Sequence, residues 1–303
     1  MVMTFVLGMT NTAFAATSVN LGIASNFAVL GGSTITNTGS TVINGDLGLY
    51  PGTSVSGFPP GVVNGTQHIT DTVAAQAKTD LVTAYDAANL QTSTSTVSGD
   101  LGGLTLTPGV YTSSSSLGLT GTLTLDGQGN SNAVFIFQIG STLTTASDSR
   151  IVLTNGAQAC NIFWVVGTSA TLGTNSNFSG SIMAMTSITV TTGATVAGSV
   201  LARNGAVTLD TDSVSKQTCT APIIIPPTPV VIPPTTTPTP IITQPIVTTP
   251  PVVTSNPTTP FVLPAGTTTL PVTGLNLSLL VMILLGLSTL AILAPRGFSY
   301  LRR

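Results

Sequence analysis

Short stretches in which apolar and polar residues alternate run through residues 18–220. This alternation predicts a chain made mainly of β-strands, and the frequent Thr, Ser, Gly and Asn favour short strands separated by turns. Two apolar runs without alternation, 134–137 and 162–166, predict strands that are buried on both faces. Trp164 lies in the second run, and we expect it in the core.

One segment, at about residues 70–90, has helical periodicity instead. Thr70 and Asp71 are the candidate N-caps. Apolar residues then recur at helical spacing at positions 73, 74, 77, 81, 84, 85 and 88, and the other side carries Gln76, Lys78, Thr79, Asp80, Thr83 and Asp86. A single apolar stripe predicts one helix packed against a larger body.

The second half of this region repeats itself when four apolar residues are aligned: Leu143, Leu172, Val190 and Leu209. The alignment puts four threonines in one column: Thr145, Thr174, Thr192 and Thr211. Offsets of 18 and 19 residues between the last three fragments suit single coils of a β-solenoid, whereas the first offset, 29 residues, requires an insertion. Stacked coils place equivalent residues about 4.8 Å apart.

Charge is scarce, with nine acidic residues, all Asp, against seven Lys and Arg. Nucleic-acid binding is excluded, because neutralising phosphates requires clustered basic residues. A carbohydrate-cleaving β-helix would need paired carboxylates on one groove, but Asp148, Asp210 and Asp212 fall on different coil positions. The only histidine, His68, has no nucleophile in a recognisable setting beside it. We therefore expect no catalytic residues, no cofactor and no metal site.

The chain has two cysteines, Cys160 and Cys219. In an oxidising compartment they could form a disulfide that pins the end of the folded domain back onto a strand. Such a loop of about 60 residues would add roughly 4 kcal/mol in the chain-entropy model. The alternative is two buried free thiols, since the sequence does not show that the sulfur atoms meet.

The N-terminal segment 1–15 has the features of an export signal. A short apolar run at 2–9 precedes Ala13-Phe14-Ala15, which has the small-x-small pattern of a signal-peptidase site before Ala16. No Lys or Arg lies ahead of the apolar run. The alternative for this segment is a buried N-terminal strand.

The C-terminal segment 270–303 has three features in a fixed order: Leu270-Pro271-Val272-Thr273-Gly274, an uncharged span at 275–294 that is long enough to cross a bilayer as a helix, and three arginines. This order resembles the cell-wall sorting signal of Gram-positive surface proteins, Leu-Pro-x-Thr-Gly. The resemblance implies that a sortase cuts after Thr273 and joins it to peptidoglycan, which places the protein at the cell wall or outer surface. The alternative is a permanent single-pass anchor.

Residues 221–269, between the predicted folded domain and the C-terminal segment, are rich in Pro, Thr, Ile and Val. Proline fixes φ and removes backbone donors, so neither helix nor sheet can propagate and we expect a disordered stalk. In the polyproline II conformation, at about 3.1 Å per residue, this stalk would reach roughly 150 Å.

Six stretches spread over the predicted domain, 16–220, resemble the ice-binding protein family of the DUF3494 type: residues 21–32, 45–48, 106–111, 133–137, 161–165 and 199–209. The resemblance implies a discontinuous β-solenoid, or β-helix, with one long α-helix packed alongside. It also implies adsorption to ice by one flat solenoid face, often with a Thr-Ala/Gly-x-Thr/Asn motif. Residues 38–41 and 192–195 match this motif, and 145–148 and 174–177 each depart from it at one position. The candidate ice-contacting residues are Thr38, Thr41, Thr145, Thr174, Asn177, Thr192, Thr195 and Thr211.

Threonine suits such a face because it holds a rigid β-branched methyl group beside a hydroxyl. Repeated in columns it forms a flat array, whose many weak contacts with a crystal act together. Alternatively, threonine columns only stabilise stacked coils by cross-strand packing. The expected function is a surface-anchored antifreeze-type protein that attaches a cell to ice or protects its surroundings. The competing function is a surface adhesin or structural display module that binds a polysaccharide or another cell.

Overall fold

The computed structural model describes residues 16–220, which form a β-solenoid with one long α-helix. The predicted fold class is confirmed for this part of the chain. The predicted export signal at 1–15, stalk at 221–269 and sorting signal with its apolar span at 270–303 lie outside the described residues and stay predictions. Within residues 16–220, no helix has the length and hydropathy of a membrane span.

Each full coil of the solenoid contributes one strand to each of three parallel sheets, which we call sheets A, B and C, and one additional strand belongs to sheet A alone. Sheet A has nine strands, in spatial order β7 (Gln67–Ile69), β4 (Asp46–Leu49), β1 (Phe27–Gly31), β23 (Val200–Ala202), β20 (Ser181–Ala184), β17 (Ile162–Val166), β14 (Phe135–Ile139), β11 (Gly109–Ser113) and β8 (Ser95–Thr96).

Sheets B and C have eight strands each and follow the same coil order. Sheet B consists of β5 (Ser54–Ser56), β2 (Thr34–Thr38), β24 (Val207–Asp210), β21 (Ile188–Val190), β18 (Ala170–Leu172), β15 (Leu143–Thr145), β12 (Leu117–Leu119) and β9 (Gly99–Asp100). Sheet C, from the opposite end, consists of β10 (Thr105–Leu106), β13 (Thr122–Asp126), β16 (Arg150–Thr154), β19 (Asn177–Ser179), β22 (Thr195–Ala197), β25 (Ser213–Ser215), β3 (Val42–Asn44) and β6 (Val62–Val63).

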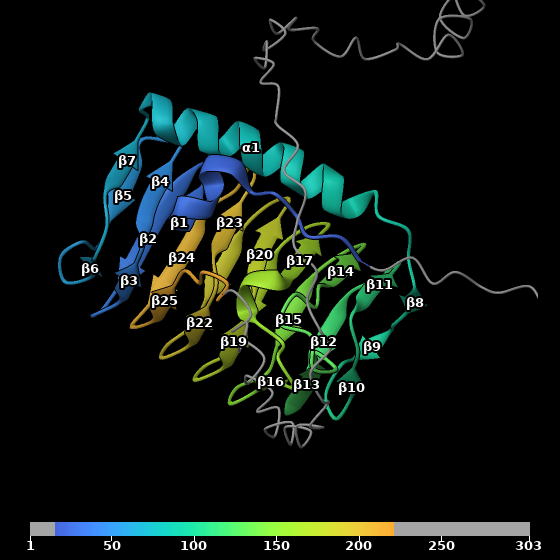
Figure 1. Cartoon of the computed structure of the whole chain (residues 1–303). Helices are drawn as coiled ribbons and strands as arrows, with labels where there is room; N and C mark the ends of the chain where they lie inside the picture. Colours follow the sequence, from blue (N-terminus) through green and yellow to red (C-terminus); the bar gives the residue numbers. More distant parts are fainter. Residues whose placement is uncertain (1–15, 221–303) are drawn as a thin grey trace, which may run out of the picture. The chain divides into compact units, whose positions relative to one another are not determined.

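The order of coils in space differs from their order in the sequence. Strand β1 of the first coil pairs on one side with β4 and on the other with β23, where Val29 lies opposite Val200. The chain therefore builds two coils at one end, crosses to the far end through the helix, and returns coil by coil until the last coil meets the first (Figure 1). This is the discontinuity that the family resemblance implied.

Helix α1 (Thr72–Asn89) makes that crossing and runs along the outside of sheet A (Figure 1). Its N-cap is Asp71, whose carboxylate accepts a hydrogen bond from the backbone N–H of Ala74 at 2.8 Å. At the other end, the side chain of Gln138 donates to the carbonyls of Ala88 and Asn89 at 2.9 and 3.2 Å, which satisfies acceptors of the last turn. The predicted helix is confirmed to within two residues at each end.

One residue predicted on the polar side of this helix is buried. Lys78 is only 8% exposed, and its ammonium group donates to the carbonyls of Ala202 and Arg203 at the end of β23. Burial, together with the nearby positive charge of Arg203, lowers the pKa of Lys78 to about 8. A lysine stem is long enough to reach from the flank of the helix to the sheet, which residue type alone does not reveal.

The apolar residues form two cores. The inner core fills the solenoid and includes Trp164, which is fully buried, as predicted, and stacks on Phe137 with ring centroids 3.9 Å apart. The outer core lies between sheet A and helix α1 and includes Leu81 and Phe163. Sheet A is thus buried on both faces, which explains the unbroken apolar runs in β14 and β17.

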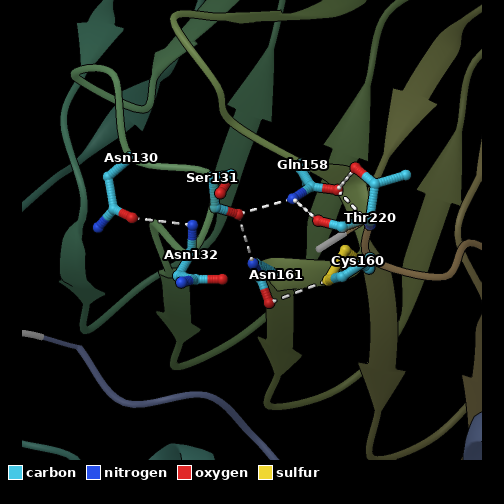
Figure 2. The surroundings of a disulfide bond; sticks show 8 residues. Asn130, Ser131, Asn132, Gln158, Cys160, Asn161 and Thr220 are labelled. Atoms are coloured by element: carbon cyan, nitrogen blue, oxygen red, sulfur yellow. Dashed lines mark hydrogen bonds between the residues drawn. A yellow bond between two sulfur atoms is a disulfide. The ribbon is translucent and has the colours of Figure 1, made fainter. Parts of the chain in front are cut away.

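After β25, residues 216–220 run along the corner where the coils pass from sheet C to sheet A. Cys219 forms a disulfide with Cys160, with 5.5 Å between the Cα atoms. Gln158 accepts from the backbone N–H of Thr220 at 2.8 Å and donates to the carbonyls of Thr220 and Ser131 at 3.1 and 2.7 Å (Figure 2). Since Cys160 lies in the short helix η2 (Ala159–Asn161) between β16 and β17, this fastening fixes residues 216–220 to the corner opposite sheet B.

Candidate functional site

The three sheets differ in what they offer to a partner. The outer face of sheet A is covered by helix α1, whereas sheets B and C carry side chains that reach solvent. A regular contact surface therefore has to lie on the outer face of sheet B, on that of sheet C, or at the corner between them.

The outer face of sheet B carries five threonines from five consecutive coils, paired in register. In spatial order they are Thr36, Thr208, Thr189, Thr171 and Thr144. Both neighbours of each threonine along its strand are buried, so the threonine points outward. We call these five residues the threonine column.

The hydroxyl groups of this column are largely unused by the protein. Thr36 and Thr208 have hydroxyl oxygens 3.4 Å apart, and those of Thr189, Thr171 and Thr144 have no hydrogen-bond partner among residues 16–220. Neighbouring parallel strands are about 4.8 Å apart, so the column repeats at a single short interval. The face therefore offers a straight row of methyl groups and hydroxyls that are free to bind water.

Small polar residues border the column at the corner between sheets A and B. Thr142 and Ser116 have hydroxyl oxygens 2.8 Å apart, and Ser187 accepts from the backbone N–H of Ala206 at 3.2 Å. Ser169 accepts from the N–H of Ser187 at 3.3 Å. These side chains tie each coil to the next, and none is long enough to rise above the threonines.

The predicted candidates lie outside the threonine column: at the ends of sheet B strands, at the corner between sheets B and C, and at the start of sheet C strands. Thr174, Thr192 and Thr211 occupy successive corner turns. Thr192 donates to a carboxylate oxygen of Asp210 at 2.5 Å, Thr211 donates to the other at 3.1 Å, and the hydroxyl of Thr174 lies 3.4 Å from that of Thr191. Most of the threonine hydroxyls at this corner are thus hydrogen-bonded within the protein.

Thr38, Asn177 and Thr195 are exposed, but they do not share one face. Thr38 ends β2 in sheet B, where it pairs with Asp210. Asn177 and Thr195 are paired at the start of β19 and β22 in sheet C. The structure therefore divides these three candidates between two faces.

Two candidates are buried and have no surface with which to contact ice, so these two predictions are wrong. Thr41 is 0% exposed, and its hydroxyl accepts from the backbone N–H of Asp212 at 3.0 Å. Thr145 is 3% exposed, and its hydroxyl accepts from the N–H of Gly173 at 2.9 Å. Both hydroxyls bind the backbone of an adjacent coil inside the solenoid, which a β-branched polar residue can do at a turn.

The burial of Thr145 comes from a register two residues away from the predicted one. Leu143 pairs with Ala170, not with Leu172, so Thr145 points inward like its partner Leu119. Arg150, not Asp148, lies opposite Asn177. Asp148 instead adopts a left-handed turn conformation with φ 57°, as Asn175 does with φ 56°. The alignment of Leu172 with Val190 is confirmed.

The outer face of sheet C is less regular than that of sheet B. One row of its paired outward residues runs Thr122, Arg150, Asn177, Thr195, Ser213, Val42 and Val62, and a second includes Ser179, Ala197, Ser215 and Asn44. The first row mixes a long cation, an amide, hydroxyls and bare valines. It lacks the repetition that a lattice would require.

Asp212 is a buried carboxylate at the corner between sheets B and C. It accepts hydrogen bonds from the backbone N–H groups of Asp210 at 2.7 Å and Ala194 at 3.1 Å. Burial, together with the negative charge of Asp210, raises the pKa of Asp212 to about 7, although the two hydrogen bonds favour the charged form. Its contacts link two coils, so its role is structural.

No arrangement for catalysis stands out among the described residues. A cleft of about 440 Å³ between the N-terminal segment and the disulfide is lined by Ser18, Asn20, Phe163, Ser199, Gln217 and their neighbours, none of them a free titratable side chain. Within residues 16–220, no three His, Cys, Asp or Glu side chains lie close enough to hold a metal ion.

The threonine column was missed by the sequence reasoning, although a signal for it exists. Thr144, Thr171, Thr189 and Thr208 each stand directly after an apolar residue, in Leu143-Thr144, Ala170-Thr171, Ile188-Thr189 and Val207-Thr208. Aligning those apolar residues puts all four threonines in one outward column. The alignment on Leu143, Leu172, Val190 and Leu209 drew attention to the threonines two positions later, at 145, 174, 192 and 211, instead.

Comparisons with known proteins agree with this fold. The model of the ice-binding-like family matches residues 29–215. An ice-binding protein of Nostoc sp. (strain HG1) is 59% identical over 210 residues, which cover 69% of this chain and 78% of the relative.

Solved structures are also similar. An ice-binding protein from an Antarctic biological consortium is 50% identical, with a TM-score of 0.66, and the match covers 70% of this chain and 96% of that one. One from the Antarctic ascomycete Antarctomyces psychrotrophicus is 46% identical, with a TM-score of 0.65, and the match covers 67% of this chain and 100% of that one. The matching family model covers more than half of the chain, and the chain therefore belongs to the ice-binding-like family.

Proposed function

We propose that this protein adsorbs to ice through the outer face of sheet B, with the threonine column at its centre. The observation that carries the proposal is the register of Thr36, Thr208, Thr189, Thr171 and Thr144 across five consecutive coils. The relatives support it, because those named above are ice-binding proteins.

Physical reasons favour this face over sheet C and the corner. A threonine in a strand has a stiff χ1 angle, so each methyl group and hydroxyl keeps its position without further loss of conformational entropy. Hydroxyls without a protein partner can hold water in a regular row, and that water can merge with a crystal surface. Each contact is weak, but contacts on one rigid body form together. A charged side chain such as Arg150 on sheet C would break such a row.

The proposal is tested with two tyrosine substitutions on the same coil, Thr189→Tyr and Thr195→Tyr. Thr189 lies in the threonine column on β21, and Thr195 lies on sheet C on β22. A residue 16–220 fragment is suitable, because a match of about the same length spans the whole of a solved relative. Thermal hysteresis, ice shaping and inhibition of recrystallisation are measured, with circular dichroism as the folding control.

We expect Thr189→Tyr to lose most of the activity, because a ring that stands above the row keeps the remaining threonines away from a flat crystal plane. Thr195→Tyr should retain the activity. The opposite pattern would move the site to sheet C. A folded wild-type domain that is excluded from growing ice would overturn the proposed function altogether.

We further propose that the protein acts from the cell surface, attaching the cell to ice or protecting its surroundings. The support is the order of Leu270–Gly274, the uncharged span 275–294 and the terminal arginines. A second support is the position of Thr220, which lies at the corner between sheets C and A and thus opposite sheet B. The last described residue is therefore held away from the threonine column.

Cell fractionation tests the anchoring. In a host with a sortase, the wild-type protein should be released from the wall only by peptidoglycan hydrolysis. Thr273→Ala should shift it to the membrane fraction, because the acyl group that a sortase would transfer belongs to Thr273. Release of both proteins into the medium would contradict anchoring.

A further inference from the structure

We infer that Gly118 sets one end of the ice-contacting row. The sheet continues through this position, and the row ends there because glycine has no side chain. This inference rests on the proposed function and names the residue that determines its extent. Gly118 lies on the coil that follows that of Thr144 in space.

The strand pairing places Gly118 in line with the threonine column. Gly118 lies opposite Thr144 on one side and Asp100 on the other. Its neighbours Leu117 and Leu119 are 1% and 2% exposed, so a side chain at position 118 would point outward, as those of the column do. From Thr36 towards this end of the sheet, the series therefore reads five threonines, then glycine, then aspartate.

Asp100 occupies the last coil and is not a continuation of the row. Its carboxylate accepts from the backbone N–H groups of Gly102 at 2.7 Å and Thr120 at 2.9 Å, which ties the carboxylate to its own turn and to the next coil. A carboxylate engaged in this way caps the end of the sheet and protects the edge strand from pairing with another chain. At this end of the sheet, Gly118 is thus the last position at which the row can be lengthened; at the other end Thr36 pairs with Ser56.

The backbone does not require glycine at position 118. A Cβ atom built there would meet nothing closer than the carbonyl oxygen of Gly99 at 3.6 Å, an ordinary van der Waals distance. At Gly173, in contrast, a Cβ atom would lie 2.5 Å from the backbone of Ala146, and at Gly39 φ is +78°. Glycine in a strand interior costs conformational entropy and packs no side chain, so a glycine without a steric reason is an open position.

A threonine at this position would fit the strand and extend the row by one coil. The test compares Gly118→Thr with Gly118→Ala in the residue 16–220 protein, with Gly118→Ser as a second hydroxyl variant. Alanine adds a Cβ atom, as threonine does, but has neither the hydroxyl nor the γ-methyl group of threonine. It therefore separates an effect on stability from an effect on ice binding. Thermal hysteresis, the lowest concentration that stops recrystallisation and the melting temperature are measured for each.

We expect both Gly118→Thr and Gly118→Ala to keep or raise the melting temperature. Only Gly118→Thr should lower the concentration needed to stop recrystallisation, by about twofold relative to wild type, as one more weak contact on a rigid array would. Equal activity of Gly118→Thr and Gly118→Ala at equal fold content overturns the inference. If Gly118→Thr does not fold, a Gly118→Ser protein no more active than Gly118→Ala overturns it.

This failure is distinguishable from failure of the proposed function. A wild-type protein that is active, and inactivated by Thr189→Tyr, keeps the face of sheet B as the contact surface whatever Gly118→Thr does. A wild-type protein without activity on ice removes the premise of the inference as well, and so overturns both.

Discussion

The threonine hydroxyls at the corner between sheets B and C differ in their partners from those on the outer face of sheet B. At the corner between sheets B and C, Thr192 and Thr211 both donate to Asp210. On the face of sheet B, Thr171 and Thr189 have no hydrogen-bond partner among residues 16–220. A hydroxyl that already donates within the protein has less capacity to order external water, so the residue type alone does not mark the contact surface.

Thr192→Val separates the two groups. Valine keeps the branched shape but removes the 2.5 Å hydrogen bond to Asp210, so the free energy of unfolding should fall by about 1 kcal/mol or less at this exposed position. Activity on ice should stay at the wild-type level. Urea titration and recrystallisation assays check the two parts, and a large loss of activity without a loss of stability would return the corner to the contact surface.

The buried carboxyl of Asp212 predicts an unusual pH dependence of stability. Its pKa is about 7 in the folded protein, against about 3.9 for an unperturbed aspartate. The fold therefore holds the proton more tightly than the unfolded chain does, so this contribution is complete below about pH 4 and is lost as the pH rises through 7. The melting temperature of the residue 16–220 protein should be higher at pH 5 than at pH 8.

Asp212→Asn is the matched control, because an amide does not titrate. The variant should lose most of the difference between pH 5 and pH 8. An equal difference in the wild type and the variant would assign the pH dependence to other groups.

The elements of this fold differ in how far the sequence alone predicts them. Helix α1 was predictable because its cap, Asp71, and its apolar stripe are local features. The coils that contain Leu172 and Val190 were aligned correctly because no insertion separates them. The coil of Leu143 was misaligned, because β16 and the turn up to η2 lengthen it and leave the spacing ambiguous. The pairing of β1 with β23 joins residues about 170 apart, and only the family resemblance indicated it.

The candidate site was predictable in kind but not in place. Repeated threonines on a solenoid face follow from composition and period. The alignment of Leu143 with Leu172 put Thr145 at a corner turn, whereas the observed pairing of Leu143 with Ala170 keeps Thr145 in β15. Side chains alternate along a strand, so Thr145 points inward like Leu143, and Thr144 points outward. The buried neighbours of Thr144 decide this in the structure, and the motif search gave no information on it.

The disulfide fastens residues 216–220 and should contribute strongly to stability. The double substitution Cys160→Ser and Cys219→Ser opens a loop of 59 residues, for which the chain-entropy model gives roughly 4 kcal/mol. We expect a lower melting temperature and, at temperatures near freezing, unchanged activity on ice, because the disulfide lies away from sheet B. Dithiothreitol should lower the melting temperature of the wild type and leave that of the double variant unchanged. An unchanged melting temperature of the wild type in dithiothreitol would contradict a stabilising disulfide.

Thr220, the last described residue, lies on the opposite side of the domain from the outer face of sheet B, which we propose as the ice-binding face. Thr220 is held at the corner of sheets C and A by Gln158 and the neighbouring disulfide (Figure 2). The threonine column lies on sheet B, and the outer face of sheet A is occupied by helix α1 (Figure 1). A support attached beyond Thr220 should therefore not compete with a crystal for the same surface.

Site-directed coupling to beads tests this arrangement. Both native cysteines are in the disulfide, so a single added cysteine is the only free thiol of the residue 16–220 protein. Beads coupled through a cysteine added after Thr220 should adhere to an ice surface, and so should beads coupled through Thr195→Cys on sheet C. Beads coupled through Thr171→Cys should not adhere, because the bead then covers the threonine column. Equal adhesion at equal protein density for all three attachments would show that ice is bound away from sheet B, and adhesion through Thr171→Cys alone would reverse the assigned orientation of the molecule.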